Sequence, residues 1–294
     1  MSRTGPFLLS PQLAERVWGG RRLGDGVGEA WDLSVHPNGA STVVTGPDRG
    51  RTLAEVVAER PDDFGGPIGL LAKRLDCADN LSVQVHPREG DPKTEAWVVL
   101  DAEPGAGVYL GFSDRPDTDV VREAALDGSL PDLLAFVELS EGDAVYVPAG
   151  TVHAIGGGLA LFELQQSSDT TYRLFDWGRT DRELHLDQAL SCADLAPPPD
   201  LPAPTKLGAA VTRLVTCPHF HIDRIGGGTD GRSLVPLDPG GHWTAVHGVS
   251  GSARTGELAV EQGDTLVVPA SAGPVELEPG PGFVGLSYGP SVTT

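Results

Sequence analysis

A thirteen-residue pattern occurs twice in the chain, and it constrains the fold more than any other feature. Residues 141–153 read EGDAVYVPAGTVH, and residues 262–274, which lie 121 positions later, read QGDTLVVPASAGP. In both copies a Gly-Asp turn leads into a short apolar strand that ends at Val-Pro-Ala. The repeat predicts two related β domains. Because His153 aligns with Pro274, any chemistry that uses this histidine belongs to the first domain.

Proline and glycine divide the rest of the chain into short segments. The 294 residues include 39 Gly and 25 Pro, a density that is typical of strands joined by tight turns. Five of the prolines fall in APPPDLPAPTKLG, where rings without an N–H oppose both helix and sheet. We therefore expect a first domain over residues 1–195, a proline-rich linker over residues 196–208 and a second domain over residues 209–294.

One stretch of the first domain favours helix rather than strand. Within residues 118–136, TDVVREAALDGSLPDLLAF, the segment VVREAAL can form a helix that ends at Gly128. Ser129, Leu130 and Pro131 then have the pattern of a cap and first turn of a second helix. The sequence predicts a protein dominated by β-structure, with a small helical insertion around residues 118–136.

The charge of the chain limits its partners. The sequence carries 21 Lys and Arg against 41 Asp and Glu, which gives a formal net charge of −20. Nucleic acids and anionic membrane surfaces attract basic proteins, so we expect neither nucleic acid nor membrane as a partner. A phosphorylated small molecule is compatible with the sequence only if a local cationic pocket opposes the overall charge.

Further features bear on the compartment. The start, MSRTGPFLLS, lacks the apolar run of a secretory signal, and no run of about 18 apolar residues could span a bilayer. The three cysteines, Cys77, Cys192 and Cys217, are an odd number without paired spacing, which predicts reduced thiols. We expect a cytoplasmic protein that is a monomer or a homodimer.

Two expected strands carry polar side chains where a core would use leucine. In residues 81–87, LSVQVHP, the apolar residues share one face and the polar residues share the other. In residues 93–100, KTEAWVVL, the same period groups Lys93, Glu95 and Trp97 on one face. An ordinary half-exposed strand gives this alternation too, with its polar face in water. The two strands alone leave a solvated face and an inward polar site as alternatives.

Joined with a histidine from the repeated pattern, these strands supply the side chains of a metal site. Two histidines and a carboxylate are a common ligand set for a catalytic divalent metal, with a further position left for water or substrate. In a β-barrel, such side chains from three strands can point into the same mouth. A glutamine ligand is unusual, because a neutral amide oxygen is a weak donor for zinc. The candidate ligands are Gln84, His86, Glu95 and His153.

Several segments, in the same order along the chain, resemble the type I mannose-6-phosphate isomerases, specifically their short bacterial branch. The most specific are LSVQVHP, KTEAWVVLDAEPGA, VPAGTVHAIG and FELQQSSDTTYRLFDWGR. WGGRRL at residues 18–23 and GEAWDLSVHPNG at residues 28–39 resemble the amino-terminal segments of that branch. The resemblance runs from about residue 7 to residue 180 and continues more loosely beyond. Shared motifs do not by themselves fix the substrate.

The resemblance implies a fold and a cofactor. The fold would be two cupin domains, each a small jelly-roll β-barrel, with metal in the first domain only. One Zn²⁺ per chain, or another divalent metal, would be held by the matching positions Gln84, His86, Glu95 and His153.

The resemblance also implies an activity, the interconversion of mannose 6-phosphate and fructose 6-phosphate. This reaction moves a proton between C2 and C1 through a cis-enediol, so oxygen charge must be stabilised while a base carries the proton. Glu163 matches an acidic active-site residue of the family. The positions that match residues around the phosphorylated hexose are Ser82, Lys93 and Arg173.

Each of these roles has a simpler alternative. Glu163 is a general base, or a partner in a salt bridge, or a residue that orients a metal ligand. Arg173 offers a guanidinium fork to an anionic oxygen or phosphate, or forms a surface ion pair. Lys93 would be a costly inward charge without an anion, which favours the phosphate or the enediolate as its partner. Ser82 either donates its hydroxyl to the phosphate or is merely structural.

Two other functions remain open on the sequence. One keeps the metal and the proton transfer but changes the phosphosugar. The other is a sugar- or metal-binding cupin without turnover. Glu163, Lys93 and Arg173 argue against this second alternative, because a binding protein has no need of a candidate base beside an anion site.

Overall fold

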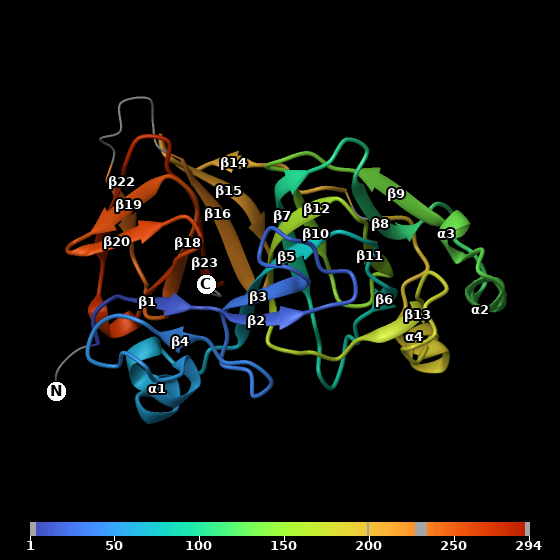
Figure 1. Ribbon diagram of the computed structural model, residues 1–294, viewed down its shortest axis with the longest axis horizontal. Helices are drawn as coiled ribbons and strands as arrows, with labels where there is room; N and C mark the ends of the chain where they lie inside the picture. The colour runs from blue at the N-terminus through green and yellow to red at the C-terminus, as the bar shows by residue number, and fades with distance from the viewer. Residues whose placement is uncertain (1–3, 199, 227–233, 292–294) are drawn as a thin grey trace. The chain divides into compact units, whose positions relative to one another are not determined.

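The computed structural model describes residues 4–198, 200–226 and 234–291 and is built largely of β-strands (Figure 1). The chain divides into two compact units. The central unit comprises Leu13–Ala30 and Lys73–Leu201, and the terminal unit comprises Met1–Gln12, Trp31–Ala72 and Pro202–Thr294. No helix among the described residues has the length and apolarity needed to cross a membrane.

The strands of the central unit belong to two sheets. The five-stranded sheet has the order β13 (Tyr172–Phe175), β6 (Val83–Val85), β11 (His153–Ile155), β8 (Gly107–Phe112) and β9 (Leu134–Glu138). The six-stranded sheet has the order β10 (Ala144–Val147), β7 (Glu95–Ala102), β12 (Leu159–Gln166), β5 (Leu70–Cys77), β3 (Val27–Leu33) and β2 (Gln12–Glu15). The chain passes between the two units within β2, β3 and β5, and again between Leu201 and Pro202.

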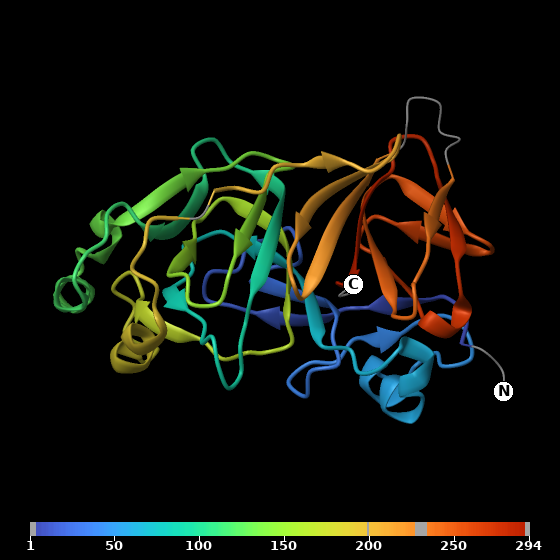
Figure 2. The ribbon, with the colours of Figure 1, turned by 180° about the vertical axis from the view of Figure 1, so that it is seen from behind.

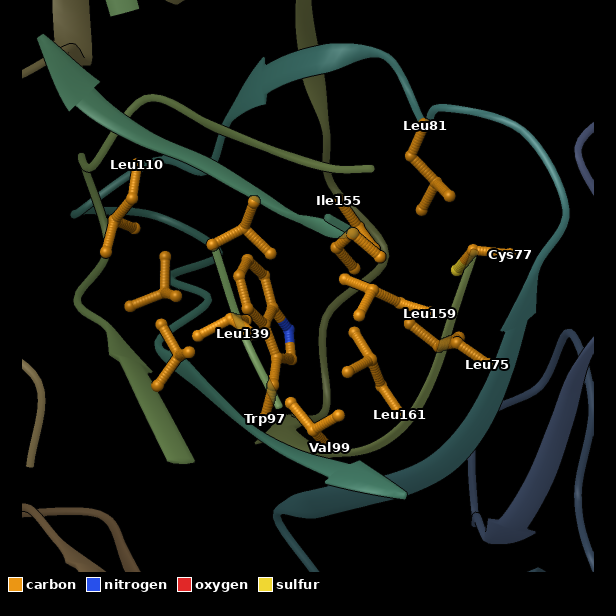
Figure 3. Packing of buried hydrophobic residues seen from close by; sticks show 14 of the residues in the cluster. Leu75, Cys77, Leu81, Trp97, Val99, Leu110, Leu139, Ile155, Leu159 and Leu161 are labelled. Carbon is orange, nitrogen blue, oxygen red and sulfur yellow. The ribbon is translucent and has the colours of Figure 1, made fainter. Parts of the chain in front are cut away.

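An apolar core lies between these sheets and is seen from close by in Figure 3, where Trp97, Val99, Ile155 and Leu161 point toward one another. Alternation along each strand separates this core from a polar end. On β7, Glu95 precedes Trp97 and Val99 on the same face, and on β11, His153 precedes Ile155. The strands therefore deliver polar side chains to one end of the core as a direct result of their period of two.

Three helices belong to the central unit, and the predicted pair is among them. α2 (Thr118–Asp127) ends at Gly128, whose φ of 93° suits glycine, and α3 (Leu130–Leu133) follows. The predicted helical stretch to residue 136 is too long, because Leu134 begins strand β9 and pairs with Phe112 of β8. α4 (Leu186–Cys192) was not predicted. Apolar residues of the three helices pack against the outward side chains of the five-stranded sheet.

The terminal unit also contains two antiparallel sheets. One has the order β14 (Thr205–Lys206), β15 (Val211–Thr216), β16 (Phe220–Gly226), β23 (Val284–Pro290), β18 (Thr244–Ser250), β21 (Thr265–Val268), β1 (Phe7–Ser10) and β4 (Thr42–Val43). The other has the order β17 (Val235–Leu237), β22 (Val275–Pro279), β19 (Ser252–Thr255) and β20 (Leu258–Glu261). The short helices of this unit are α1 (Leu53–Glu59), η1 (Pro61–Phe64) and η2 (Ala270–Ala272).

The compact units differ in extent from the expected domains of residues 1–195 and 209–294. The amino-terminal strand β1 pairs with β21, with Phe7 opposite Val267, so the two ends of the chain share one sheet (Figure 2). Part of the expected linker is also ordered as strand, since Thr205 of β14 pairs with Arg213 of β15. The prediction that the first domain carries the metal and the second does not stays a prediction.

The repeated sequence pattern corresponds to a repeated strand pairing. In the central unit Val147 of β10 lies opposite Glu95 of β7, and in the terminal unit Val268 of β21 lies opposite Thr244 of β18. Thr244 therefore takes the position that Glu95 has in the first copy. Buried apolar side chains, including Val246 and Leu266, surround these strands of the terminal unit. Both copies keep the strand frame, but only the first has a carboxylate at this position.

Candidate metal centre

Three buried side chains converge at the polar end of the central unit. His86 follows β6 directly, and Glu95 and His153 are the first residues of β7 and β11. One potential ligand atom from each lies within 4.8 Å of the others. Within the described part of the chain this is the only group of three or more His, Cys, Asp or Glu side chains so arranged. Three of the four ligands predicted from the sequence are thus brought together.

Backbone carbonyls fix the protonation of both imidazoles. Nδ1 of His86 lies 2.9 Å from the carbonyl oxygen of Thr170, and Nδ1 of His153 lies 2.9 Å from that of Thr151. A carbonyl oxygen can only accept, so each Nδ1 carries a proton, and in the neutral imidazole it is then Nε2 that keeps the lone pair. Burial, followed by the charge of Lys93, lowers the pKa of His86 to about 4. Both histidines can therefore present an unprotonated Nε2 to a cation.

The two lone pairs face the carboxylate of Glu95. Nε2 of His86 lies 3.4 Å from Oε2, and Nε2 of His153 lies 3.1 Å from Oε1. Burial opposes ionisation of Glu95, but the positive charge of Lys93 holds its pKa well below its usual range. The protein groups that approach the two carboxylate oxygens are these imidazoles and the ammonium of Lys93. Acceptors that face one another in this way fit a divalent metal ion.

Lys93 brings a positive charge to the same group. Its Nζ lies 2.7 Å from Oε2 of Glu95 and 3.2 Å from Nε2 of His86. Burial alone would lower the pKa of this lysine, but Glu95 and then Glu163 raise it above its ordinary value. The inward placement expected from the sequence is therefore present, with the ammonium beside two of the candidate ligands.

Gln84 is in the middle of β6, and Ser82 is the residue just before this strand. Gln84 is opposite His153, and its Nε2 lies 3.3 Å from Nε2 of that histidine. Ser82 donates its hydroxyl to Oε1 of Gln84 over 3.2 Å. The predicted neighbours are thus in contact, but it is the amide nitrogen of Gln84 that faces His153. Its role as a fourth ligand stays a prediction.

Glu163 is held by two donors in the interior of the central unit. It lies opposite Trp97, whose Nε1 donates to Oε1 over 3.1 Å. Nζ of Lys73 lies 3.4 Å from Oε2, and both side chains of this ion pair are buried. The sequence reasoning did not identify Lys73. The sequence could have pointed to it, because Lys73 lies within the otherwise largely apolar stretch LLAKRLDC and a buried lysine requires a partner.

Arg173 lies across from Gln84 on β13, and its backbone is fixed by His185. Arg173 N donates to Nδ1 of His185 over 3.2 Å, and His185 N donates to the carbonyl oxygen of Arg173 over 2.8 Å. The side chain donates from Nη1 to the carbonyl oxygen of Glu183, while its buried Nε has no partner in the described chain.

Two other arginines lie near Arg173, and carboxylates pair with both of them. Arg179 and Arg182 share Asp176, and Nη1 of Arg179 also lies 3.4 Å from Oδ2 of Asp79. Burial and then the charge of Arg182 lower the pKa of Arg173. No carboxylate pairs with Arg173 among the described residues, so the alternative of a simple surface ion pair has no support here. An anion would supply the missing partner.

Comparison with known proteins agrees with this geometry. The model of the family "Phosphomannose isomerase type I, catalytic domain" matches residues 22–104. Mannose-6-phosphate isomerase of Streptococcus mutans serotype c (strain ATCC 700610 / UA159) is 35% identical to this chain, in an alignment that covers 90% of this chain and 92% of that protein.

Solved structures share the fold over nearly the whole chain. The crystal structure of mannose 6-phosphate isomerase from Bacillus subtilis superposes with a TM-score of 0.86 at 28% identity, and covers 97% of this chain and all of that one (100%). A crystal structure of a zinc-bound mannose 6-phosphate isomerase gives a TM-score of 0.79 at 17% identity, over 97% of this chain and 99% of that one. The predicted cupin architecture is confirmed by these likenesses. The extensive match to the Streptococcus mutans enzyme, together with the family model, shows that the chain belongs to the type I phosphomannose isomerases, a family of isomerase enzymes.

Proposed function

We propose that this enzyme interconverts mannose 6-phosphate and fructose 6-phosphate through a cis-enediol, with zinc in the central unit. The observation that carries the proposal is the convergence of two imidazole Nε2 atoms and one ionised carboxylate beside the ammonium of Lys93. The names of the similar proteins support the substrate, and the zinc-bound relative supports the metal.

His86, Glu95 and His153 would hold the metal, with Gln84 as the fourth protein ligand. Their nitrogen and oxygen donors, with no thiolate, suit zinc and do not exclude other divalent metals. When bound, zinc supplies a Lewis acid that stabilises charge on the substrate oxygens without changing oxidation state. The carbonyl groups of Thr170 and Thr151 keep the imidazoles in the tautomer and orientation that the metal requires.

Glu163 is the candidate for the group that moves the proton. The reaction removes a proton from C2 of the aldose and returns one to C1, while the oxygens at these carbons exchange carbonyl and hydroxyl character. Lys73 and Trp97 hold the Glu163 carboxylate. Trp97 is also the residue opposite Glu163 on the neighbouring strand, two residues from Glu95. The ion pair with Lys73 also fits the alternative in which Glu163 only braces the site, so its role requires a direct test.

The cations of the site divide between the two ends of the substrate. Lys93 lies among the candidate ligands, where its charge suits the oxygens of the reacting carbons C1 and C2. Arg173 has an unpaired Nε and two neighbouring arginines, which suits the phosphate at C6. Ser82, whose hydroxyl is shared with Gln84, would bind the substrate with them.

The reaction in D2O tests the proton-transfer step. Through a cis-enediol, fructose 6-phosphate that forms from mannose 6-phosphate should carry deuterium at C1, measurable by NMR, because the base exchanges its proton with solvent. Complete retention of the original hydrogen would follow either from direct transfer between the carbons or from a base shielded from solvent, and the turnover of Glu163→Gln distinguishes the two. A panel of other hexose and pentose phosphates tests the substrate, and faster turnover of one of these would assign the site to that phosphosugar. Binding without any turnover would favour the non-catalytic alternative.

The remaining expectations concern the state of the protein in the cell. No disulfide links Cys77, Cys192 or Cys217 in the described part of the chain, where Cys77 is buried and the other two are partly buried. Reduced thiols support the proposal of a cytoplasmic enzyme. Whether it is a monomer or a homodimer stays a prediction, which light scattering of the purified protein can test.

A further inference from the structure

Gln165 lies inside the central unit, directly beside a candidate metal ligand. On β12 it is the cross-strand partner of Glu95 on β7, and directly opposed residues of antiparallel strands project from the same face of a sheet. Its side chain is fully buried, with 0% of its surface exposed. None of the roles assigned to the site above uses this residue.

The orientation of the Gln165 amide is fixed by two backbone carbonyls. Nε2 lies 2.9 Å from the carbonyl oxygen of Gln166 and 2.7 Å from that of Ser168. Only the NH2 group can donate to two acceptors, so Oε1 must point to the other side. That oxygen has no hydrogen-bond partner among the described residues. The chain thus holds a buried acceptor in a set direction and leaves it without a donor.

The neighbouring protein groups do not supply that donor. Glu95 is ionised and can only accept, and the proton-bearing Nδ1 atoms of His86 and His153 are already engaged by carbonyls. Lys93 directs its ammonium to Glu95 and His86. Leaving a buried acceptor unpaired is unfavourable, so a ligand with an O–H group would relieve this cost on binding.

We propose that Oε1 of Gln165 accepts a hydrogen bond from a hydroxyl of the hexose, at C3 or C4, and so makes Gln165 a sugar-recognising residue. A phosphate dianion has no proton to donate, so the partner must be the carbohydrate end of the substrate. The position beside Glu95 places this contact near the reacting carbons rather than at the phosphate. The inference rests on the proposed function, since it assumes a hexose phosphate in this site.

Deoxy substrates combined with one variant test the inference. Wild-type enzyme should lose about 10- to 100-fold in kcat/KM on 3-deoxy- or 4-deoxy-mannose 6-phosphate relative to mannose 6-phosphate, because the acceptor then stays unpaired. In Gln165→Met the parent sugar should lose a similar factor, and the deoxy sugar should then react about as fast as the parent. This loss of discrimination is a readout that general damage to the site would not produce.

Gln166→Met is the matched control. Gln166 is the next residue on the strand, so its side chain projects from the opposite face, and its Oε1 already accepts from the backbone N of Thr94 over 3.0 Å. This variant should keep the wild-type discrimination between parent and deoxy sugars. Zinc content of both variants should equal that of the wild type.

The outcomes separate this inference from the function on which it rests. If wild type converts mannose 6-phosphate but handles both deoxy sugars as well as the parent, the inference is overturned and the proposed function stands. This measurement needs no variant, so it decides even if Gln165→Met fails to fold. Loss of zinc from Gln165→Met would also overturn it, by assigning the residue to the metal. If zinc-loaded wild type shows no turnover, the proposed function falls, and the inference with it.

Discussion

Trp97 contacts both the candidate base and a candidate metal ligand. Its indole Nε1 lies 3.1 Å from Oε1 of Glu163, and its ring centroid lies 5.4 Å from that of His153, with the planes inclined at 66°. Trp97 is fully buried in the apolar core of the central unit. One core side chain therefore sets the position of two residues whose proposed roles in the reaction differ.

We expect Trp97→Phe to lower kcat more than it changes KM. Phenylalanine keeps an aromatic ring near His153 but removes the N–H that holds Glu163. A hydrogen bond to a charged group contributes about 1.5–3 kcal/mol, which corresponds to a loss of about 10- to 100-fold. Steady-state kinetics and zinc analysis measure the effect. Phe162→Leu is the control, because Phe162 is also fully buried but precedes Glu163 on the opposite face of β12. Equal losses of kcat in the two variants would contradict a specific role for the indole.

Glu163→Gln tests the base directly. The amide retains the size of the side chain and can still accept from Trp97, but it cannot take a proton from carbon. We expect turnover to fall at least about 100-fold, the usual scale for a general base, with zinc content and fold unchanged. Circular dichroism and metal analysis accompany the kinetics. Near-normal turnover would assign Glu163 to the ion pair with Lys73 alone.

Replacing a metal ligand and replacing the neighbouring lysine should have different effects on zinc binding. His153→Ala removes an imidazole whose Nε2 faces Glu95, so the purified variant should contain much less zinc. Lys93→Met removes a positive charge that lies 2.7 Å from Oε2 of Glu95 and repels a metal ion, so zinc should bind at least as tightly while activity falls. Mass spectrometry of metals in both proteins checks this pair. Full zinc stoichiometry in His153→Ala would mean that the ligand assignment is wrong.

The metal-free protein should lose stability in acid through His86. Burial and Lys93 lower the pKa of this histidine from 6.5 to about 4 in the folded state, so between these values the unfolded chain binds a proton that the folded chain does not. The free energy of unfolding should therefore fall as the pH falls through this range, by about 3 kcal/mol at most from this residue.

Urea unfolding at pH 7.5 and at pH 5 measures this dependence. His86→Gln cannot titrate in this range, so its free energy of unfolding should depend less steeply on pH than that of the wild type. Ionisable groups that do not interact with His86 cancel in the difference, which therefore reports His86 together with its neighbours Lys93 and Glu95. Parallel pH profiles of the two proteins would contradict the neutral state of His86.

The positions of the candidate ligands could be predicted because strand alternation leaves little freedom. His86 and Glu95 lie at strand ends with inward parity, and His153 begins a strand that pairs with β6. A period of two places such residues on a common face before any pairing is known. The structure confirms their convergence, and their function as ligands stays a prediction.

The partners of Glu163 and the role proposed for Gln165 could not be derived in the same way. Both depend on the register between β7 and β12, which sets Trp97 opposite Glu163 and Glu95 opposite Gln165. Register is fixed by the packing of the whole sheet rather than by the pattern within one strand. The alternation along β12 predicts that Glu163 and Gln165 share a face. It does not predict which residues of the neighbouring strand lie opposite them.

The pairing of strands from the two ends of the chain in one sheet could not be predicted from the sequence pattern either. β1 pairs with β21 across more than two hundred residues, and nothing in the local sequence of either strand specifies this partner. Helix α1, by contrast, has a readable signal that the sequence reasoning missed. Thr52 and Glu55 form a capping box, a spacing of Thr and Glu that predicts a helix start.

The most direct test of the central claim is a chelation experiment on the isomerase reaction. Purified enzyme would be assayed for conversion of mannose 6-phosphate to fructose 6-phosphate before chelation, after removal of metal and after zinc is restored. The site of His86, Glu95 and His153 predicts that activity is lost with the metal and returns with zinc. Full activity in protein shown to be free of metal would contradict it.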